Sequence, residues 1–194
     1  MKLLDAAALF EQDPDIDRLR EAFDLVSADP ARGRAMLEEL ASKGSVQSMV
    51  YLARAYGKAG DAKQAERWYQ EAYARNSSAG LYGLGRMCVS NKNYEEATRI
   101  FLDGTLRNDG VSMLWLARLY LREPITQERS ARIRELLEES TKQGQIRAMN
   151  KLAFLLMQGR YGARGIPRGV ILYFRSIIDA FRVASRNTTD RRLW

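Results

Sequence analysis

The apolar positions of this chain recur in blocks of similar length. Four leucines each begin a closely similar tripeptide, and they are separated by 32, 32 and 36 residues. These are Leu52, Leu84, Leu116 and Leu152. Apolar pairs in a second register are separated by 32, 32, 36 and 36 residues and begin at Met36, Trp68, Ile100, Leu136 and Leu172. Because two registers share one set of spacings, the chain contains an internal repeat. The residues that lengthen the later intervals fit into segments 122–130 and 159–168.

Each repeat contains two stretches with the apolar periodicity of an amphipathic helix. In the first stretch, a stripe at i, i+4 and i+8 begins with a small residue, as in Ser48, Leu52 and Tyr56. A small residue at that place allows a neighbouring helix to approach closely. Residues typical of helix ends follow the second stretch of each pair: Gly44, Asn76, Asp109-Gly110 and Gly144.

These patterns predict one all-α domain over residues 15–187, made of five helix pairs. The predicted units are about 15–44, 45–76, 77–109, 110–144 and 145–187. Residues 1–14 form an N-terminal lead-in, and residues 188–194 form a basic tail.

The residues of the repeat resemble a known family. The series Gly44-x3-Ser48-x3-Leu52-Ala53-x2-Tyr56, followed by Ala65-x2-Trp68-Tyr69-x2-Ala72, resembles a Sel1-like repeat, a close relative of the tetratricopeptide repeat. The likeness covers residues 30–175. It implies a right-handed α-solenoid of about five helix-turn-helix repeats that acts as an adaptor for other proteins. By analogy with bacterial members, it also implies an accessory role in envelope or exopolysaccharide assembly.

An arginine stands two residues after the core leucine in three repeats: Arg54, Arg86 and Arg118. Two residues correspond to about 200° of helix, so these side chains point away from the core stripe. The same face carries Tyr51 and Lys58 in one repeat, and Trp115 and Arg122 in another. The resemblance places this face along the concave groove of the solenoid.

Arginine binds carboxylates in a bidentate manner and stacks on aromatic rings. We therefore expect the groove to bind an acidic or extended segment of a partner protein through these seven residues. The alternative is an ordinary solvated helix face, with ion pairs to glutamates of neighbouring helices.

The last predicted helix, residues 169–186, is apolar around most of its circumference. Its polar residues are spaced 4, 3 and 4 apart and form one narrow stripe: Arg175, Asp179, Arg182 and Arg186. A terminal helix of a solenoid needs a polar outer face. We therefore expect the lead-in or the tail to cover this helix, or a protein, a second copy or an anionic membrane surface to bind it.

The charges are also divided between the two ends. Residues 160–194 contain eight arginines and two aspartates, whereas residues 1–40 contain five Lys/Arg and ten Asp/Glu. Docking of the basic end on the acidic end of another copy is a further alternative.

Composition narrows the function. The chain has no histidine, the commonest general base and transition-metal ligand. Its single cysteine, Cys88, lies at a core position and excludes an intramolecular disulfide. No phosphate loop or nucleophile motif is present. We therefore predict that the protein is not an enzyme and has no cofactor and no metal site.

Nucleic acid is an unlikely partner despite the net charge of +7, because the N-terminal repeats are acidic. Asp5 interrupts the apolar start of the chain, and no stretch is apolar for long enough to span a bilayer. We predict a cytoplasmic location, with the inner face of a membrane as the alternative.

Overall fold

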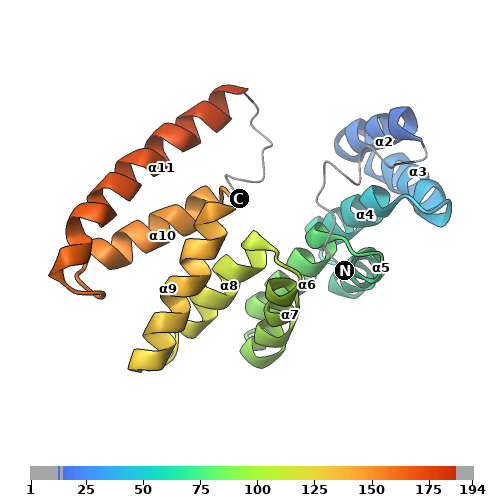
Figure 1. Cartoon of the computed structure of the whole chain (residues 1–194). Helices are drawn as coiled ribbons and strands as arrows, with labels where there is room; N and C mark the ends of the chain where they lie inside the picture. The colour runs from blue at the N-terminus through green and yellow to red at the C-terminus, as the bar shows by residue number, and fades with distance from the viewer. Residues whose placement is uncertain (1–12, 14, 187–194) are drawn as a thin grey trace. The chain divides into compact units, whose positions relative to one another are not determined.

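The structure, a computed structural model, describes residue 13 and residues 15–186. The predicted tail over 188–194 and all of the predicted lead-in except residue 13 lie outside the described residues. The described residues form α-helices and one short 3₁₀ helix, with no extended strand among them (Figure 1). This confirms the predicted all-α class.

The chain packs into two compact units, Met1–Asn108 and Asp109–Trp194. The first unit contains α2 (Ile16–Ala28), α3 (Pro30–Ser42), α4 (Val46–Lys58), α5 (Ala62–Ala74), α6 (Ser78–Ser90) and α7 (Tyr94–Leu106). The second unit contains α8 (Gly110–Tyr120), α9 (Gln127–Lys142), α10 (Ile146–Met157), the 3₁₀ helix η1 (Ala163–Gly165) and α11 (Ile166–Arg186). The extra residues of the longer intervals fall between α8 and α9 and between α10 and α11, as the sequence predicted.

Helices α2 to α9 all begin in the same way. A side-chain oxygen of the capping residue accepts a hydrogen bond from the backbone N–H three residues later, which satisfies one of the free donors of the first turn. The capping residues are Asp15, Asp29, Ser45, Asp61, Ser77, Asn93, Asp109 and Thr126. The sequence therefore sets the start of each of these helices locally.

Most of the helix ends are marked by a residue in the left-handed region. Gly44, Asn76 and Gly144 have φ of 99°, 63° and 79°, which confirms these three predicted helix ends. The prediction of a stop at Asp109-Gly110 is wrong by a few residues. Helix α7 ends at Leu106, Asn108 adopts the left-handed conformation, and Asp109 instead caps α8. An aspartate followed by a glycine can end one helix or cap the next, and only the observed bounds of the two helices distinguish these roles.

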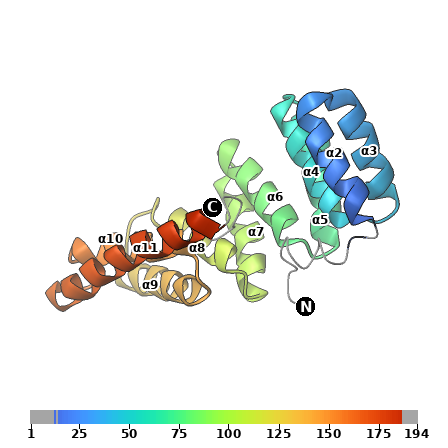
Figure 2. The ribbon, with the colours of Figure 1, turned by 90° about the horizontal axis from the view of Figure 1, so that it is seen from above.

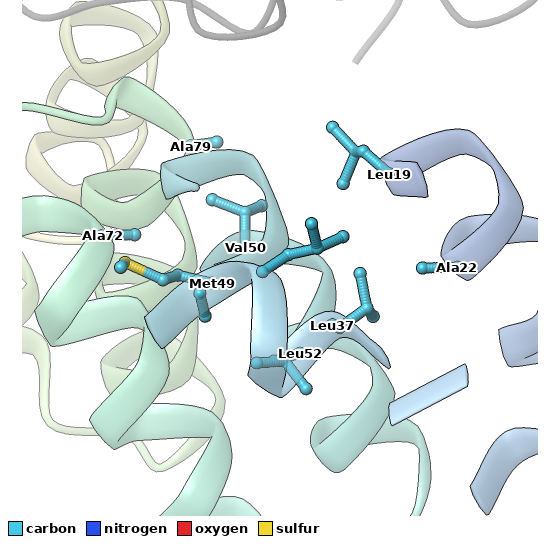
Figure 3. Close-up of a cluster of buried hydrophobic side chains, with 10 residues drawn as sticks. Leu19, Ala22, Leu37, Met49, Val50, Leu52, Ala72 and Ala79 are labelled. Carbon is cyan, nitrogen blue, oxygen red and sulfur yellow. The ribbon is translucent and has the colours of Figure 1, made fainter. Parts of the chain in front are cut away.

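The core of the first unit is formed where neighbouring helix pairs meet. Leu19 and Ala22 of α2, Leu37 of α3, and Met49 and Leu52 of α4 are all buried in one cluster (Figure 3). Helix α2 packs against α3, α3 against α4, and α4 also contacts α2 and α6 (Figure 2). Each pair therefore buries its apolar faces against the next pair, as in other repeat proteins.

A glycine permits one of the closest helix approaches. A Cβ atom at Gly80 of α6 would lie 2.6 Å from the backbone nitrogen of Tyr73 on α5. Gly80 occupies the place at which the sequence predicted a small residue, and the close contact confirms the reason for that prediction.

In the second unit, α8 packs on α9, α9 on α10, and α10 on α11. Its largest fully buried side chains are Leu116, Ile133, Leu137, Leu152 and Leu156. Over the described part of the chain, no helix is both long enough and apolar enough to cross a membrane.

Candidate partner-binding face

The three predicted arginines occupy equivalent places on α4, α6 and α8. The leucines two residues before them are buried, with exposed fractions of 0%, 7% and 0% for Leu52, Leu84 and Leu116. Arg54, Arg86 and Arg118 are all exposed. The half-turn geometry of the helix therefore places each guanidinium on the side opposite the core.

In the first unit, the charges of Arg54 and Arg86 both act on Tyr69. Tyr69 of α5 is half-buried, and its hydroxyl group lies within the electrostatic range of the Arg54 guanidinium. Burial raises the pKa of Tyr69, while the positive charges of Arg54 and Arg86 act to lower it. Both guanidinium groups are thus close enough to act on one phenol oxygen.

Gly83 of α6 makes room for this tyrosine. A Cβ atom at Gly83 would lie 2.3 Å from two ring carbons of Tyr69, so any larger side chain would displace the ring. The Tyr69 ring therefore packs against the backbone of α6 because Gly83 has no side chain.

Aromatic rings flank the two arginines. The Arg86 guanidinium lies over the ring of Tyr82, 5.7 Å from its centroid. Tyr51, one turn before Arg54 on α4, packs against Phe23 of α2 with 4.8 Å between ring centroids. Phe23 is 52% exposed. We call Tyr51, Arg54, Tyr69, Tyr82 and Arg86 the arginine–tyrosine face.

Some arginines of the first unit pair with a carboxylate, whereas the two arginines of this face do not. Arg18 forms a bidentate pair with Glu39 at 2.7 and 2.8 Å, and Arg75 pairs with Glu71 at 2.8 Å. Within residues 15–186, neither Arg54 nor Arg86 forms an ion pair with a carboxylate. Both guanidinium groups of the face are therefore without an ion pair in the described part of the protein.

The remaining predicted residues occupy two other places. Lys58 is the last residue of α4 and is exposed. In the second unit, the Arg118 guanidinium lies 4.7 Å from the ring centroid of the half-buried Trp115. Arg122 is exposed and lies beyond the end of α8. The structure therefore places Arg54 and Arg86 where both charges act on Tyr69, and it stacks Arg118 on Trp115 within the other unit.

The described residues offer little for catalysis or metal binding. No group of three or more His, Cys, Asp or Glu side chains among them is arranged to hold a metal ion. Cys88 is half-buried in α6, and burial raises the pKa of its thiol, so the reactive thiolate is disfavoured.

Sequence reasoning missed three residues of this surface. Tyr69 was counted only among the apolar pairs of the second register, and Tyr82 and Phe23 were not considered. One signal was available for Tyr82, because an aromatic residue stands three or four positions before each of the three arginines. The position of Tyr69 depends on its contact with Gly83 of the next helix, which no local pattern reveals.

The sequence matches no protein-family profile and no curated protein. Solved structures do resemble it. A protective antigen of uropathogenic Escherichia coli with an SLR (Sel1-like repeat) fold gives a TM-score of 0.68 at 20% identity over 86% of this chain, although this chain spans only 38% of that protein. A Sel1 repeat protein from Oxalobacter formigenes gives 0.68 at 13% identity, covering 97% of this chain and 83% of its own. MamA gives 0.50 at 15% identity, covering 86% and 89%.

These similarities agree with the capped helix pairs, the repeated close approaches and the all-helical content described above. At such low identities they establish the fold alone. The chain has the α-solenoid fold of the Sel1-like repeat proteins.

Proposed function

We propose that this chain is a protein-interaction scaffold that binds an acidic, extended segment of a partner through the arginine–tyrosine face. The observation that carries the proposal is the exposed, equivalent placement of Arg54 and Arg86 beside tyrosine rings, with no ion pair to a carboxylate among the described residues. Arg118 and Trp115 supply a similar pair of groups on the second unit.

The chemistry of the face suits carboxylates. A guanidinium group binds a carboxylate through two parallel N–H···O bonds, and such charge-assisted bonds are about twice as strong as neutral ones. Contacts with Tyr69 and Tyr82 restrict the two arginines before any partner binds, which reduces the entropy lost on binding. The half-buried tyrosine rings beside them and the exposed ring of Phe23 add apolar contact area for the side chains of a bound peptide.

Stacked helix pairs are a common support for such a face, because their surfaces are long and built from repeating positions. The setting in envelope or exopolysaccharide assembly comes from the family resemblance alone, and we retain it as a hypothesis about the cellular role. Proteins recovered from a native lysate would identify that role.

The proposal can be tested with a labelled octaglutamate peptide as the probe and fluorescence anisotropy as the measurement. We expect the Arg54→Ala/Arg86→Ala variant to bind the probe at least about tenfold more weakly, because each loss removes a charge-assisted hydrogen bond. Arg32→Ala/Lys63→Ala is the matched control, since it removes two exposed positive charges from α3 and α5 of the same unit. Its affinity should change by less than about threefold.

An Arg54→Lys/Arg86→Lys variant separates bidentate recognition from simple charge, because lysine keeps the charge and loses the planar fork. Unchanged circular dichroism would show that all three variants are folded. An equal loss of probe affinity in the control variant and in the double alanine variant would refute the proposal. Full retention of lysate partners by the double alanine variant would refute it as well.

A further inference from the structure

Helix α11 uses a narrow row of small residues to pack on α10. Gly169, Ser176 and Val183 recur every seven residues, which is about two helical turns, and all three are buried. A Cβ atom at Gly169 would lie 2.9 Å from the carbonyl oxygen of Ala153, and the Ser176 hydroxyl donates to the side-chain oxygen of Asn150. This row therefore fixes which side of α11 faces the rest of the second unit (Figure 1).

The opposite side of α11 is apolar and exposed. Six large side chains on it have exposed fractions between 40% and 75%: Val170, Ile171, Phe174, Ile177, Ile178 and Phe181. Together they cover the helix from its second turn almost to its end. Exposed apolar surface of this extent is characteristic of an interaction site, since scattered single residues are the rule elsewhere on soluble proteins.

Arginines line one edge of this apolar surface. Arg168, Arg175 and Arg182 also recur every seven residues, directly before the residues of the packed row. All three are exposed. Asp179 lies between two of them, 3.6 Å from Arg175 and 3.6 Å from Arg182, and is half-buried. Arg168 pairs with Glu138 of α9 at 3.1 Å, and Glu138 also pairs with Arg134. Because each carboxylate is shared by two guanidinium groups, the edge remains positive.

The positive charge of the whole protein is concentrated in this region. Residues 145–194 contain 10 Lys/Arg and 2 Asp/Glu, a balance of +8, whereas residues 1–144 contain 21 and 22, a balance of −1. The two balances sum to the net charge of +7. Arg160 and Arg164, in the connection before α11, are exposed as well.

We propose that the outer side of α11 binds the surface of a bilayer that contains anionic lipids, with the helix axis parallel to the membrane plane. The apolar side chains enter the boundary between headgroups and acyl chains, as in other amphipathic interfacial helices. The arginines reach the phosphate groups, since their long side chains extend to the polar layer while their stems stay in apolar surroundings.

Charge complementarity favours a lipid surface over a second copy of the chain. In a symmetric dimer formed through this side, each copy would bring the same arginine row and the same excess of positive charge to the interface. Anionic headgroups supply the opposite charge along the whole length of the helix. A fluid bilayer also adapts to a convex helix surface without needing a matching shape.

Vesicle flotation of the full chain tests this inference. We expect the protein to float with vesicles containing about 30% phosphatidylglycerol and to stay behind with pure phosphatidylcholine. Binding should weaken on raising the salt from about 0.1 M to about 0.5 M. Arg160→Gln/Arg164→Gln should reduce binding about 25-fold, since each basic residue near the surface contributes about fivefold.

A second variant tests the contribution of the apolar side chains to vesicle binding. Phe174→Ser/Phe181→Ser should reduce vesicle binding about 100-fold or more, because two large apolar groups no longer enter the bilayer. Phe23→Ser/Leu106→Ser is the matched control, since these residues are also exposed, at 52% and 79%, but lie on α2 and α7. The control should bind like the unmodified chain.

Three results would overturn the inference. One is failure of the unmodified chain to float with anionic vesicles. A second is undiminished flotation of Phe174→Ser/Phe181→Ser when its circular dichroism matches that of the unmodified chain. The third is a dimer in light scattering that this variant converts to a monomer, because a second copy would then occupy the apolar side of α11.

Discussion

Replacing Gly80 by alanine is expected to destabilise the first unit, whereas the same replacement at Gly57 is expected to stabilise it. Both glycines lie in the first helix of a predicted pair, Gly80 in α6 and Gly57 in α4. They differ in what a new methyl group would contact. At Gly57 the nearest atom is the Cβ of Ala65 at 3.8 Å, an ordinary van der Waals distance, whereas Gly80 abuts the backbone of α5 at 2.6 Å.

The magnitudes follow from two opposing effects. Alanine is favoured over glycine in a helix by roughly 0.5–1 kcal/mol. Overpacking a close contact costs about 1–3 kcal/mol, and a backbone neighbour cannot rotate away as a side chain can. We therefore expect Gly80→Ala to lose about 1–2 kcal/mol and Gly57→Ala to gain about 0.5–1 kcal/mol.

Urea unfolding followed by far-ultraviolet circular dichroism measures both changes. Because stacked repeats can unfold in steps, the order of the midpoints is the primary result, and equal slopes would justify conversion to free energies. If Gly80→Ala unfolds at the same urea concentration as Gly57→Ala, or at a higher one, then α5 and α6 do not approach each other as described.

Two other predictions concern the α5–α7 region. Phe101→Ala should lower the free energy of unfolding by about 3–5 kcal/mol, because Phe101 is fully buried. Leu102→Ala should lower it by less than about 1 kcal/mol, because Leu102 is 39% exposed. Comparable losses for the two variants in urea unfolding would contradict the assigned core. Burial and the hydrogen bond to Asp103 raise the pKa of Tyr73 from 10.0 to about 12, so its contribution to stability is complete below pH 10 and is lost as the pH rises toward 12. Tyr73→Phe should reduce this alkaline loss in unfolding midpoints, and phenolate absorbance showing no tyrosine with a raised pKa would count against the contact.

Much of the fold follows from local sequence. The two apolar registers place the helix pairs, and capping residues such as Ser45 and Ser77 set where helices begin. The exception at Asp109-Gly110 shows the limit of that reasoning. The same two residues fit a helix end and a helix start, and the choice depends on whether Asn108 adopts a positive φ.

The candidate site was less accessible from sequence. Helical geometry alone exposes Arg54 and Arg86, but the tyrosine on which both charges act lies on a different helix and is positioned by Gly83. On α11 the sequence predicts a narrow polar stripe. It does not reveal that Gly169, Ser176 and Val183 form the packed row. A serine fits a buried position there only because its hydroxyl group donates a hydrogen bond to Asn150.

The short connections between helix pairs, which we call joints, limit the ways in which the length of this chain can change in evolution. Each of three joints consists of a basic residue, a left-handed residue and a capping residue: Lys43-Gly44-Ser45, Arg75-Asn76-Ser77 and Arg107-Asn108-Asp109. They stand 32 residues apart, so loss or duplication of one such block at the genetic level rejoins equivalent joints. A change of any other length inside a helix would rotate the residues that follow by about 100° for each residue and remove their apolar face from the core. The extra residues of the longer intervals lie instead in the connections between helices. Evolution can therefore lengthen or shorten this scaffold in whole units while leaving the local folding instructions intact.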